Sequence, residues 1–577
     1  MQHALTSRRG PGAAFQAVRR FAARGLVQLL ASPRALAVAG ALFCIFIAAM
    51  ERDAASMPFV ILCGALIAAV THALSGRWKF ALYLAASLLT LSTLASFAKF
   101  RMMVINAHVF DVWFYVLNPQ TVMFLASEFA PLMLAAGVAA AAFAMLSLLV
   151  WRFDRPARSS RWVSALAALA CAAMLPLAFP SGADDFNYHI TKRHFTSSLF
   201  ASFSDLARFA GADPLAAPPA GAPAATPFEP QAACNLAAGA PDIIFTLAES
   251  SVPPAAIPGW KHDPSLGEYF KSFDGQLHRA RVETYGGGTW ISHASVFSGV
   301  SMADYGWKRP YATMLLRDQM RHGLAAYLAQ CGYRTVVLSP QMFRFVDEGP
   351  ALTALGFGEY LDYKKLGTPS AHEADAFYFG KALDYYRRHI AADRRPLLMF
   401  IMTMGAHSPY DYRMEPGRQA KGEPFGNDAE TDEYLRRLTF AQEDYAGFLG
   451  EIRALNRPAV AAQFGDHHPI ITRDAFERAG VNQNASDWGS KLYETFYAVT
   501  PINFAPAAAL PAAPALDLAF LGVTVLEVAG IPLDAAFAGT RTLREACHGA
   551  FHTCARRDLV DLHLARLKQS AFEPRSK

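Results

Sequence analysis

The chain has 577 residues, of which 53% are hydrophobic and only 18% are charged, and its formal net charge is +5. This length exceeds one ordinary domain, and soluble globular proteins carry about 25% charged residues, so we expect at least two units, one of them in a membrane. The small net charge and the lack of a nucleic-acid-binding motif argue against a DNA- or RNA-binding protein.

The first 34 residues are basic and contain no acidic side chain, which predicts a cytoplasmic N-terminus. Apolar stretches then predict a transmembrane domain of about five helices over residues 35–180, because a helix needs about 20 apolar residues to cross a bilayer. The stretches are residues 35–50, 57–74, 80–98, 131–150 and 162–179. The first is short and can extend back into 26–31. A cleaved signal peptide is the competing interpretation of that stretch, and the four later stretches argue against it.

The charges of the connecting loops predict the orientation. Arg77 and Lys79 follow the second stretch, and four arginines lie between residues 152 and 161, on the same side as the N-terminus. Lys99 and Arg101 are a small exception. With five crossings, everything after the last stretch lies outside the cytoplasmic membrane, in a periplasmic or extracellular position.

Two connecting regions have their own composition. Residues 99–130 mix aromatic side chains with few charges, which indicates an outer interfacial segment that either admits a lipid substrate or only connects two helices. Residues 181–240 begin with a short juxtamembrane helical region and continue as a linker rich in Pro and Ala. We place the start of a second domain, 241–577, near Pro241.

Strand-like and helix-like patterns alternate in this second domain. Residues 242–250, 334–340, 396–404 and 458–466 are apolar and β-prone, as expected of parallel strands covered on both faces. Residues 314–332 and 376–392 have helical patterns. The alternation predicts an α/β sandwich.

Polar side chains follow three of these strands, and ligands of open α/β sheets bind beyond the carboxyl ends of the strands. Glu249 follows the first strand and His407 the third, while Asp466, His467 and His468 follow the fourth. A single histidine at a strand end is more often structural. The convergence of three such ends predicts a functional site.

A glycine-rich turn supplies a candidate nucleophile. Three glycines precede Thr289, and the residues after it have helical spacing. A hydroxyl in the first turn of a helix is well placed to meet a phosphate or sulfate, because the free N–H groups there bind anions. The alternative is that Thr289 only caps the helix. Ser292 and His293 are weaker candidates.

The cysteines of the second domain fit an oxidising compartment. Cys547 and Cys554 are the pair we expect to be bonded, and Cys234 and Cys331 permit a second disulfide. The three remaining cysteines fall in the apolar stretches and read as small buried hydrophobic residues. They are Cys44, Cys63 and Cys171.

Four motifs resemble the sulfatase-like branch of the alkaline phosphatase superfamily, of the membrane-anchored lipoteichoic acid synthase type of phosphoglycerol transferase. They are "LAES", "GGGTW", "MGAHSPYD" and "FGDHHP", and "LDLAFLGVTVLEVAGI" is similar to the closing helix of such domains. The resemblance covers residues 241–541 and implies an α/β alkaline phosphatase-like fold.

The resemblance also implies a site for one divalent metal ion. Its ligands would be Glu249, Thr289, Asp466 and His467, with Thr289 as nucleophile. His407 would be catalytic and contact the substrate phosphate, and Arg344 and His468 are further substrate-binding candidates. For Arg344 the alternative is a structural surface arginine. Oxygen ligands with one imidazole suit Mn²⁺, and Mg²⁺ and Zn²⁺ are also compatible.

The activity expected from this resemblance is transfer of phosphoglycerol or phosphoethanolamine from a membrane phospholipid to a glycan or lipid acceptor, through a phospho-threonine. A true sulfatase needs a C/S-x-P-x-R motif, and the segment around Thr289 has none. A phosphodiesterase or sulfatase-like hydrolase is the alternative. An inactive relative acting as a membrane scaffold is a third hypothesis, against which the complete ligand set argues.

Overall fold

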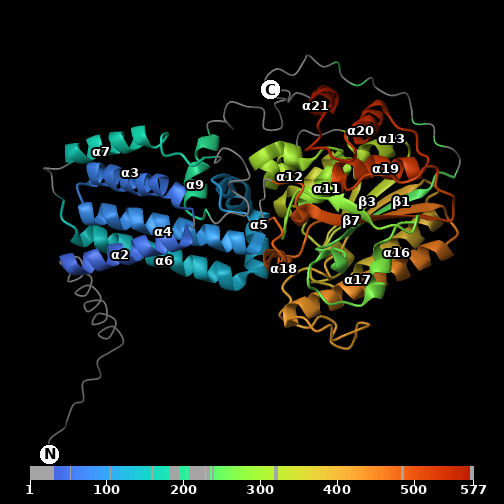
Figure 1. Ribbon diagram of the computed structural model, residues 1–577, viewed down its shortest axis with the longest axis horizontal. Coiled ribbons are helices and arrows are strands. Elements are labelled where there is room, and N and C mark those ends of the chain that lie inside the picture. Colours follow the sequence, from blue (N-terminus) through green and yellow to red (C-terminus); the bar gives the residue numbers. More distant parts are fainter. Residues whose placement is uncertain are drawn as a thin grey trace, which may run out of the picture. The chain divides into compact units, whose positions relative to one another are not determined.

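The computed structural model describes residues 32–51, 53–103, 105–156, 161–181, 194–206, 239–317, 322–482 and 487–571, with the single residues 226, 228, 234 and 236. The chain divides into two compact units (Figure 1). The first comprises residues 1–101, 105–111 and 125–206. The second comprises residues 102–104, 112–124 and 207–577.

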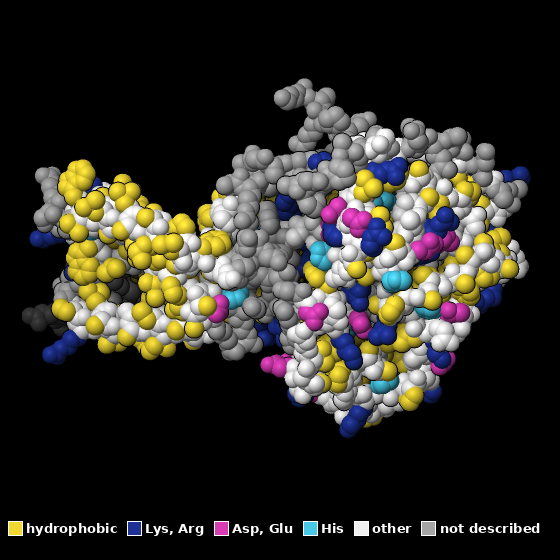
Figure 2. Space-filling model, turned by 45° about the horizontal axis from the view of Figure 1, so that its top comes forward, with side chains coloured by type: hydrophobic (Ala, Val, Ile, Leu, Met, Phe, Trp, Pro, Cys, Tyr) yellow, Lys and Arg dark blue, Asp and Glu magenta, His cyan; other side chains and the backbone are white. Residues whose placement is uncertain are grey.

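The first unit is a bundle of apolar helices. Four helical stretches of the described residues are long and apolar enough to cross a membrane. They are Pro33–Met50 (α2), Ala54–Ser75 (including α3, Met57–Ser75), Trp78–Arg101 (in α4, Trp78–Met103) and Ala130–Phe153 (α6, the same bounds). Figure 2 shows that hydrophobic side chains dominate the visible surface of this unit. The predicted helical membrane domain is confirmed.

The fifth predicted stretch contains a shorter helix. Helix α7, Arg161–Met174, has 14 residues, and turns continue the chain to residue 178. At one end the Nδ1 atom of His72 in α3 lies 2.8 Å from Ser164 Oγ. At the other end the ring centroids of Phe59 and Phe179 are 5.6 Å apart. Residues 161–179 therefore run antiparallel to α3 along its whole length, although only part of them is helical.

The short juxtamembrane helix α9, Ser197–Ala201, returns to the end of α2. The buried carboxylate of Glu51 accepts hydrogen bonds from the backbone N–H groups of Thr196 (2.8 Å) and Ser197 (3.1 Å) and so caps this helix. Part of the predicted juxtamembrane region is thus helical. Residues 182–193 and the Pro/Ala-rich linker at 207–225 lie outside the described residues.

The second unit is built on an eight-stranded sheet in the order β4-β3-β5-β1-β6-β7-β2-β8. The strands β4, β3, β5, β1 and β6 are parallel to their neighbours, whereas β7 is antiparallel to β6 and β2 to β7. Their bounds are β1 Asp242–Ala248, β2 His278–Arg281, β3 Arg334–Leu338, β4 Glu359–Leu361, β5 Leu397–Met402, β6 Ala459–Gly465, β7 Glu494–Ile502 and β8 Leu516–Asp517. The four predicted strands are confirmed.

Helices cover both faces of the sheet, which explains why the central strands β5, β1 and β6 are buried at every position. On one face Ile244 of β1 lies in a core with Tyr378 of α16, Asp375–Ala392, and Phe448 of α17, Ala429–Ala454. On the other face Phe245 packs edge-to-face on Phe297 of α11, Thr289–Ser298. Helices α13, α19 and α20 also cover this face in Figure 1. The predicted α/β fold class is confirmed.

One predicted helix was wrong in extent. Residues 314–332 are not one helix but contribute to α12, Ala312–Leu316, and α13, Leu324–Gln330. A Cβ atom at Gly323 would lie 2.8 Å from the carbonyl oxygen of Phe297, so tight packing against α11 interrupts the pattern there. The closing helix is α19, Leu521–Val528, preceded by β8 and a 3₁₀ turn, and α20, Ala535–Ala546, follows it.

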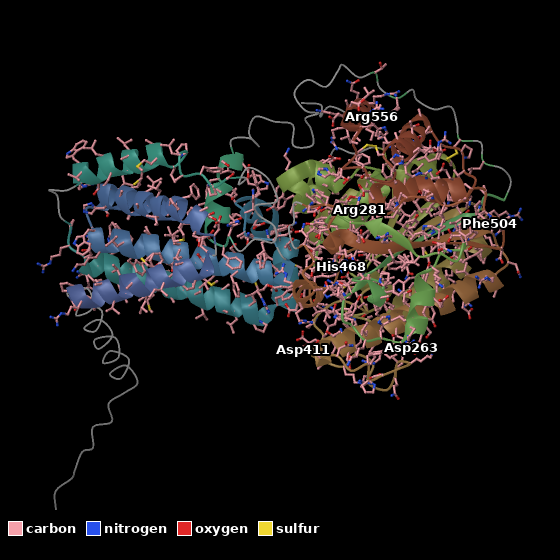
Figure 3. All side chains as sticks on the ribbon, viewed as in Figure 1. Asp263, Arg281, Asp411, His468, Phe504 and Arg556 are labelled. Atoms are coloured by element: carbon pink, nitrogen blue, oxygen red, sulfur yellow. A yellow bond between two sulfur atoms is a disulfide. The ribbon has the colours of Figure 1, made fainter. Side chains whose placement is uncertain are left out.

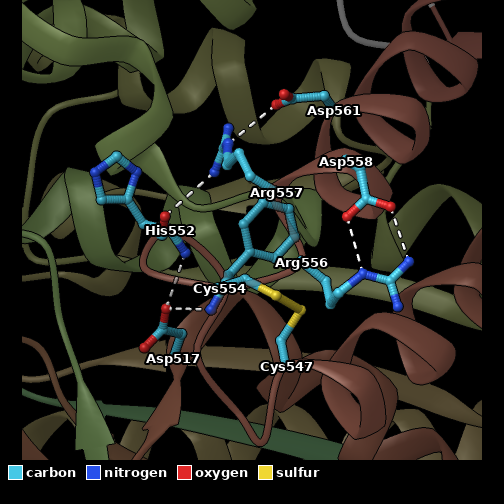
Figure 4. Close-up of a disulfide and its surroundings, with 9 residues drawn as sticks. Asp517, Cys547, His552, Cys554, Arg556, Arg557, Asp558 and Asp561 are labelled. Atoms are coloured by element: carbon cyan, nitrogen blue, oxygen red, sulfur yellow. Dashed lines mark hydrogen bonds and ion pairs between the residues drawn. A yellow bond between two sulfur atoms is a disulfide. The ribbon is translucent and has the colours of Figure 1, made fainter.

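Both disulfides considered from the sequence are present, Cys234–Cys331 and Cys547–Cys554. The second closes a loop whose N–H groups at Phe551 and His552 donate to the carboxylate of Asp517 (Figure 4). Cys63 is buried as expected, but Cys44 is exposed and Cys171 is only partly buried. Cys44 lies in α2, which is long and apolar enough to cross a membrane, and a side chain on such a helix needs no protein cover to be shielded from water.

Candidate functional site

The three polar strand ends meet because their strands are adjacent in the sheet, in the order β5-β1-β6. Ala248 of β1 pairs with Gly465 of β6, so Glu249 and Asp466, which follow them, leave the sheet at the same level. His407 lies on the loop that follows β5. The predicted convergence of these residues at one edge is thus present in the structure.

Thr289 is the first residue of α11 and points its hydroxyl at this edge. The turn before it consists of Gly286, Gly287 and Gly288, whose φ angles are 74°, 158° and 85°, a region that favours glycine. Thr289 Oγ1 donates a hydrogen bond of 3.1 Å to Glu249 Oε2 and lies 3.4 Å from His467 Nε2. The nucleophile candidate is therefore in direct contact with two of the predicted metal ligands.

Glu249, Asp466 and His467 form the one group of metal-binding type among the described residues, with one donor atom from each within 4.8 Å of the others. His467 Nε2 is 3.1 Å from Asp466 Oδ2 and 3.7 Å from Glu249 Oε1. On the other side of the ring, His467 Nδ1 lies 3.0 Å from the carbonyl oxygen of His468. Donation to that carbonyl assigns the proton to Nδ1 and leaves the Nε2 lone pair facing the carboxylates.

The hydrogen bonds of Asp466 leave one carboxylate oxygen for a ligand. Its Oδ1 atom accepts from the N–H groups of Ser250 (2.8 Å) and His467 (2.9 Å). Its Oδ2 atom is buried and has no hydrogen-bond partner within the described part of the chain. A buried carboxylate oxygen without a donor, next to a second carboxylate and an imidazole, fits a divalent cation.

The charges at the site point to the same conclusion. Burial raises the pKa of Glu249, but the nearby His467 and His407 and the hydroxyls of Ser250 and Thr289 outweigh it and lower the pKa overall. Burial, and then the negative charge of Glu249, raise the pKa of Asp466 well above its usual value. Burial lowers the pKa of His467. Two buried carboxylates at this separation repel each other, and a cation between them would relieve that repulsion.

A glycine sets the close approach of the two strand ends. A Cβ atom added to Gly465 would lie 2.1 Å from the carbonyl oxygen of Ser251, so any larger residue would push the ends of β1 and β6 apart. Asp466 follows this glycine directly, and its position depends on that contact.

His407 is half-buried, and its imidazole lies beside that of His372, with ring centroids 5.5 Å apart. Its Nδ1 atom contacts the carbonyl oxygen of Ser408. His372 lies in the loop before α16 and was not predicted from the sequence, because it follows no strand pattern.

Two buried arginines of α17 hold the loop that carries His407. Arg437 donates from Nη1 to the carbonyl of His407 (3.1 Å) and from Nη2 to the carbonyl of Tyr412 (2.7 Å). Arg436 binds the carbonyls of Glu415 (3.3 Å) and Arg418 (3.2 Å). Both arginines pair with Glu433. This clamp was not predicted from the sequence, although Glu433 lies three and four residues before two arginines on one helix, a spacing that brings their side chains together.

The two other substrate-binding candidates lie differently. His468 is buried, its Nε2 atom is 2.7 Å from the carbonyl oxygen of Glu494, and burial lowers its pKa to about 4 (Figure 3). Its own carbonyl also accepts from the N–H of Gly286 at 3.1 Å. Arg344 is exposed, and no contact in the described part of the chain joins it to Thr289 or to the metal-binding group. Their roles toward a substrate stay predictions.

The weaker nucleophile candidates on α11 are engaged in packing. Ser292 donates to the carbonyl of Asp466 at 2.6 Å, and His293 Nε2 lies 2.9 Å from Glu348. Both side chains are buried. Among the hydroxyls considered from the sequence, Thr289 is thus the one that contacts the metal-binding group.

Residues 281–499 match the model of the sulfatase family. An uncharacterized protein of Haemophilus influenzae is 26% identical over 321 residues, which are 52% of this chain and 56% of that protein. The chain thus spans little more than half the length of this relative. The match confirms the sulfatase-like part of the resemblance that the motifs predicted.

Three solved structures are similar at low identity. Lipooligosaccharide phosphoethanolamine transferase A of Neisseria meningitidis is 13% identical, with 78% of this chain and 88% of that chain covered and a TM-score of 0.48. The phosphoglycerol transferase GacH of Streptococcus pyogenes, in complex with sn-glycerol-1-phosphate, is 14% identical, with coverage of 59% and 88% and a TM-score of 0.45. The lipoteichoic acid synthase LtaP of Listeria monocytogenes is 16% identical, with coverage of 52% and 74% and a TM-score of 0.41.

Proposed function

We propose that this chain, in which residues 281–499 match the sulfatase family model, is a membrane-anchored, metal-dependent phosphotransferase. It moves a phosphoglycerol group, or alternatively phosphoethanolamine, from a membrane phospholipid to a glycan or lipid acceptor outside the cytoplasmic membrane. The observation that carries the proposal is the Thr289 hydroxyl, bonded to Glu249 and beside His467 at a buried cation-binding group.

The first step is attack of Thr289 Oγ1 on the phosphorus of the donor lipid. A divalent cation held by Glu249, Thr289, Asp466 and His467 would lower the pKa of the threonine hydroxyl and neutralise phosphate charge. The ligand set suits Mn²⁺, and Mg²⁺ or Zn²⁺ also fit it. The hydroxyl proton passes to Glu249, which already accepts it in a hydrogen bond.

His407 carries out the other two proton transfers. The protonated imidazole gives its proton to the leaving oxygen of diacylglycerol, and the substituted phosphoryl group stays on Thr289. In the second half-reaction His407 takes the proton of the acceptor hydroxyl as that oxygen attacks phosphorus, and Glu249 returns its proton to Thr289. With water as acceptor the same sequence is hydrolysis, which is the alternative function.

The anchor supports a lipid donor. Helices α2, α3, α4 and α6 are apolar enough to cross a membrane, and residues 161–179 run the length of α3. If this last segment also crosses, the second unit lies on the side opposite the basic N-terminus, where the positive-inside rule expects it. ATP is lacking on that side, and a phospholipid is the accessible donor.

Mass spectrometry of a trapped adduct tests the proposal. The full chain would be incubated with phosphatidylglycerol or phosphatidylethanolamine labelled in the headgroup, quenched in acid and digested. We expect a headgroup phosphate on the peptide that contains Thr289, none on Thr289→Ala, and a retained adduct on Thr289→Ser. An unmodified peptide together with normal turnover would refute the covalent mechanism. Label that ends only in water-soluble glycerol phosphate would favour the hydrolase.

A further inference from the structure

A short segment that lies between two membrane helices in the chain packs within the catalytic unit. Residues 112–124 belong to the second unit, although α4 precedes them and α6 follows them. They include a π-helical turn at Val112–Val116 and most of α5, Pro119–Glu128. Phe114 stacks on Tyr311 with 4.7 Å between ring centroids, and the ring centroids of Phe124 and Phe345 are 4.2 Å apart.

The inner side of this segment connects to the residue after the nucleophile. Tyr115 donates its hydroxyl to the carbonyl of Pro310 at 3.2 Å, and the same carbonyl accepts the indole N–H of Trp290 at 2.8 Å. Trp290 also packs edge-to-face on Phe345, with 6.2 Å between ring centroids. Two independent contact routes thus lead from residues 112–124 to the first turn of α11, where Thr289 lies.

The outer side of the segment is apolar and exposed. Five large side chains here, which we call the apolar strip, are between 50% and 67% exposed: Val112, Trp113, Val116, Leu117 and Met123. No Asp, Glu, Lys or Arg occurs from residue 112 to residue 127. A water-facing surface of this composition is unfavourable, so the apolar strip requires a covering partner.

We propose that the apolar strip contacts the lipid bilayer surface and that it holds the acyl chains of the donor lipid while the headgroup reaches Thr289. The short connections of this segment to α4 and α6 favour the bilayer as the partner. Val112 follows the end of α4, Met103, by nine residues, and Phe124 precedes the start of α6, Ala130, by six. Fully extended, such connections reach only about 30 Å and 20 Å from the two candidate membrane helices.

The composition agrees with this partner. Trp and Tyr favour the headgroup depth of a bilayer, and charges are absent where they would oppose insertion. The second clause of the proposal, that the strip holds the donor, rests on the proposed function. The first clause, contact with the bilayer, does not depend on the proposed function. A soluble protein or a second copy of the chain covering the strip would be a different result of the experiments below.

A depth measurement tests the bilayer contact. The full chain, with Cys44, Cys63 and Cys171 replaced by Ala, would carry Val116→Cys labelled with a nitrobenzoxadiazole dye, in vesicles of phosphatidylglycerol and phosphatidylethanolamine. Leu277→Cys is the matched control, because Leu277 is apolar, 45% exposed and part of the same unit. We expect acyl-chain nitroxides to quench the dye at 116 at least threefold more than at 277, and aqueous iodide to show the reverse order. Equal quenching at both positions would overturn the proposal, as would protection at 116 from both quenchers, because a protein would then cover the strip.

A comparison of two substrates tests the role in catalysis. Turnover of long-chain phosphatidylglycerol in vesicles and of its water-soluble dibutanoyl analogue would be measured for the Val116→Ser/Leu117→Ser double variant and for Leu277→Ser. We expect the ratio of long-chain to short-chain turnover to fall about tenfold in the double variant and to stay unchanged in Leu277→Ser. An unchanged ratio, whether both activities fall or neither does, would overturn the donor-holding role. An unmodified chain that turns over neither substrate would instead refute the proposed function, and the quenching result would still decide the bilayer contact.

Discussion

Replacing Arg437 by lysine tests whether α17 positions His407, the proposed catalytic histidine. The guanidinium of Arg437 joins three groups at once, the carboxylate of Glu433 at 2.6 Å and the carbonyls of His407 and Tyr412 at 3.1 Å and 2.7 Å. A lysine ammonium is a compact point charge that lacks this planar fork and cannot reach all three. In Arg437→Lys we expect the ammonium to stay with Glu433 and the two carbonyls to lose their donors.

The size of the effect follows from these contacts. Each of these partly buried carbonyls, left without its donor, costs up to about 1–3 kcal/mol, so the loop that carries His407 would shift or open. A displacement of about 1 Å at a catalytic group lowers the rate by about 10², which corresponds to about 2.7 kcal/mol in the activation barrier. We therefore expect kcat/KM of Arg437→Lys to fall about a hundredfold, with the loss in kcat rather than in metal affinity.

Arg436→Lys is the matched control for this measurement. Arg436 is equally buried and also pairs with Glu433, but its carbonyl partners are those of Met414, Glu415 and Arg418 and not that of His407. Steady-state turnover of headgroup-labelled phospholipid would be compared with the melting temperature of each variant. If both variants lose the same activity at the same loss of melting temperature, the clamp is only structural and the positioning argument is wrong. Full activity in Arg437→Lys would refute it as well.

Two further predictions concern the metal and the pH dependence of stability. Asp466→Asn keeps an oxygen that accepts from Ser250 and His467 but removes the charge, and we expect it to bind divalent metal at least a hundredfold more weakly by calorimetry. Glu283→Gln serves there as a buried control with unchanged affinity, and stoichiometric metal in Asp466→Asn would contradict the assigned site. Burial, and then the charge of Asp517, raise the pKa of Glu283 to about 8, so the native state favours the protonated form and loses stability as pH rises from about 4.5 to about 8. Glu283→Gln should therefore raise the melting temperature of the second unit at pH 9, where the gain in free energy of unfolding is at most ~5 kcal/mol, and leave the melting temperature nearly unchanged at pH 5. An equal change at both pH values would show that the carboxyl is not the cause.

Those parts of the fold that depend on local pattern were predictable. The strands around Ile244, Val336, Met399 and Ala461 are buried on both faces, and their continuous apolar runs identified them. The site was predictable for the same reason, because parallel strands deliver Glu249 and Asp466 to one edge. The break in the helical pattern over 314–332 could not be predicted, because the interruption at Gly323 depends on the carbonyl of Phe297, which is remote in sequence.

Other features arise only from tertiary contact. The assignment of residues 112–124 to the catalytic unit depends on rings such as Tyr311 and Phe345, which no local pattern connects to Phe114 or Phe124. The clamp on His407 depends likewise on α17 packing beside the loop. The length of α7 was overestimated because turns continue the apolar run after Met174, and hydropathy does not distinguish a helix from apolar turns.

The contact between Gly465 and Ser251 also limits how this protein can diverge. Because this glycine tolerates no side chain, we expect substitutions of Gly465 to displace Asp466 and lower activity, so new donor or acceptor preferences would have to arise elsewhere. A family built in this way would keep one reaction centre and change its substrates through the walls around it.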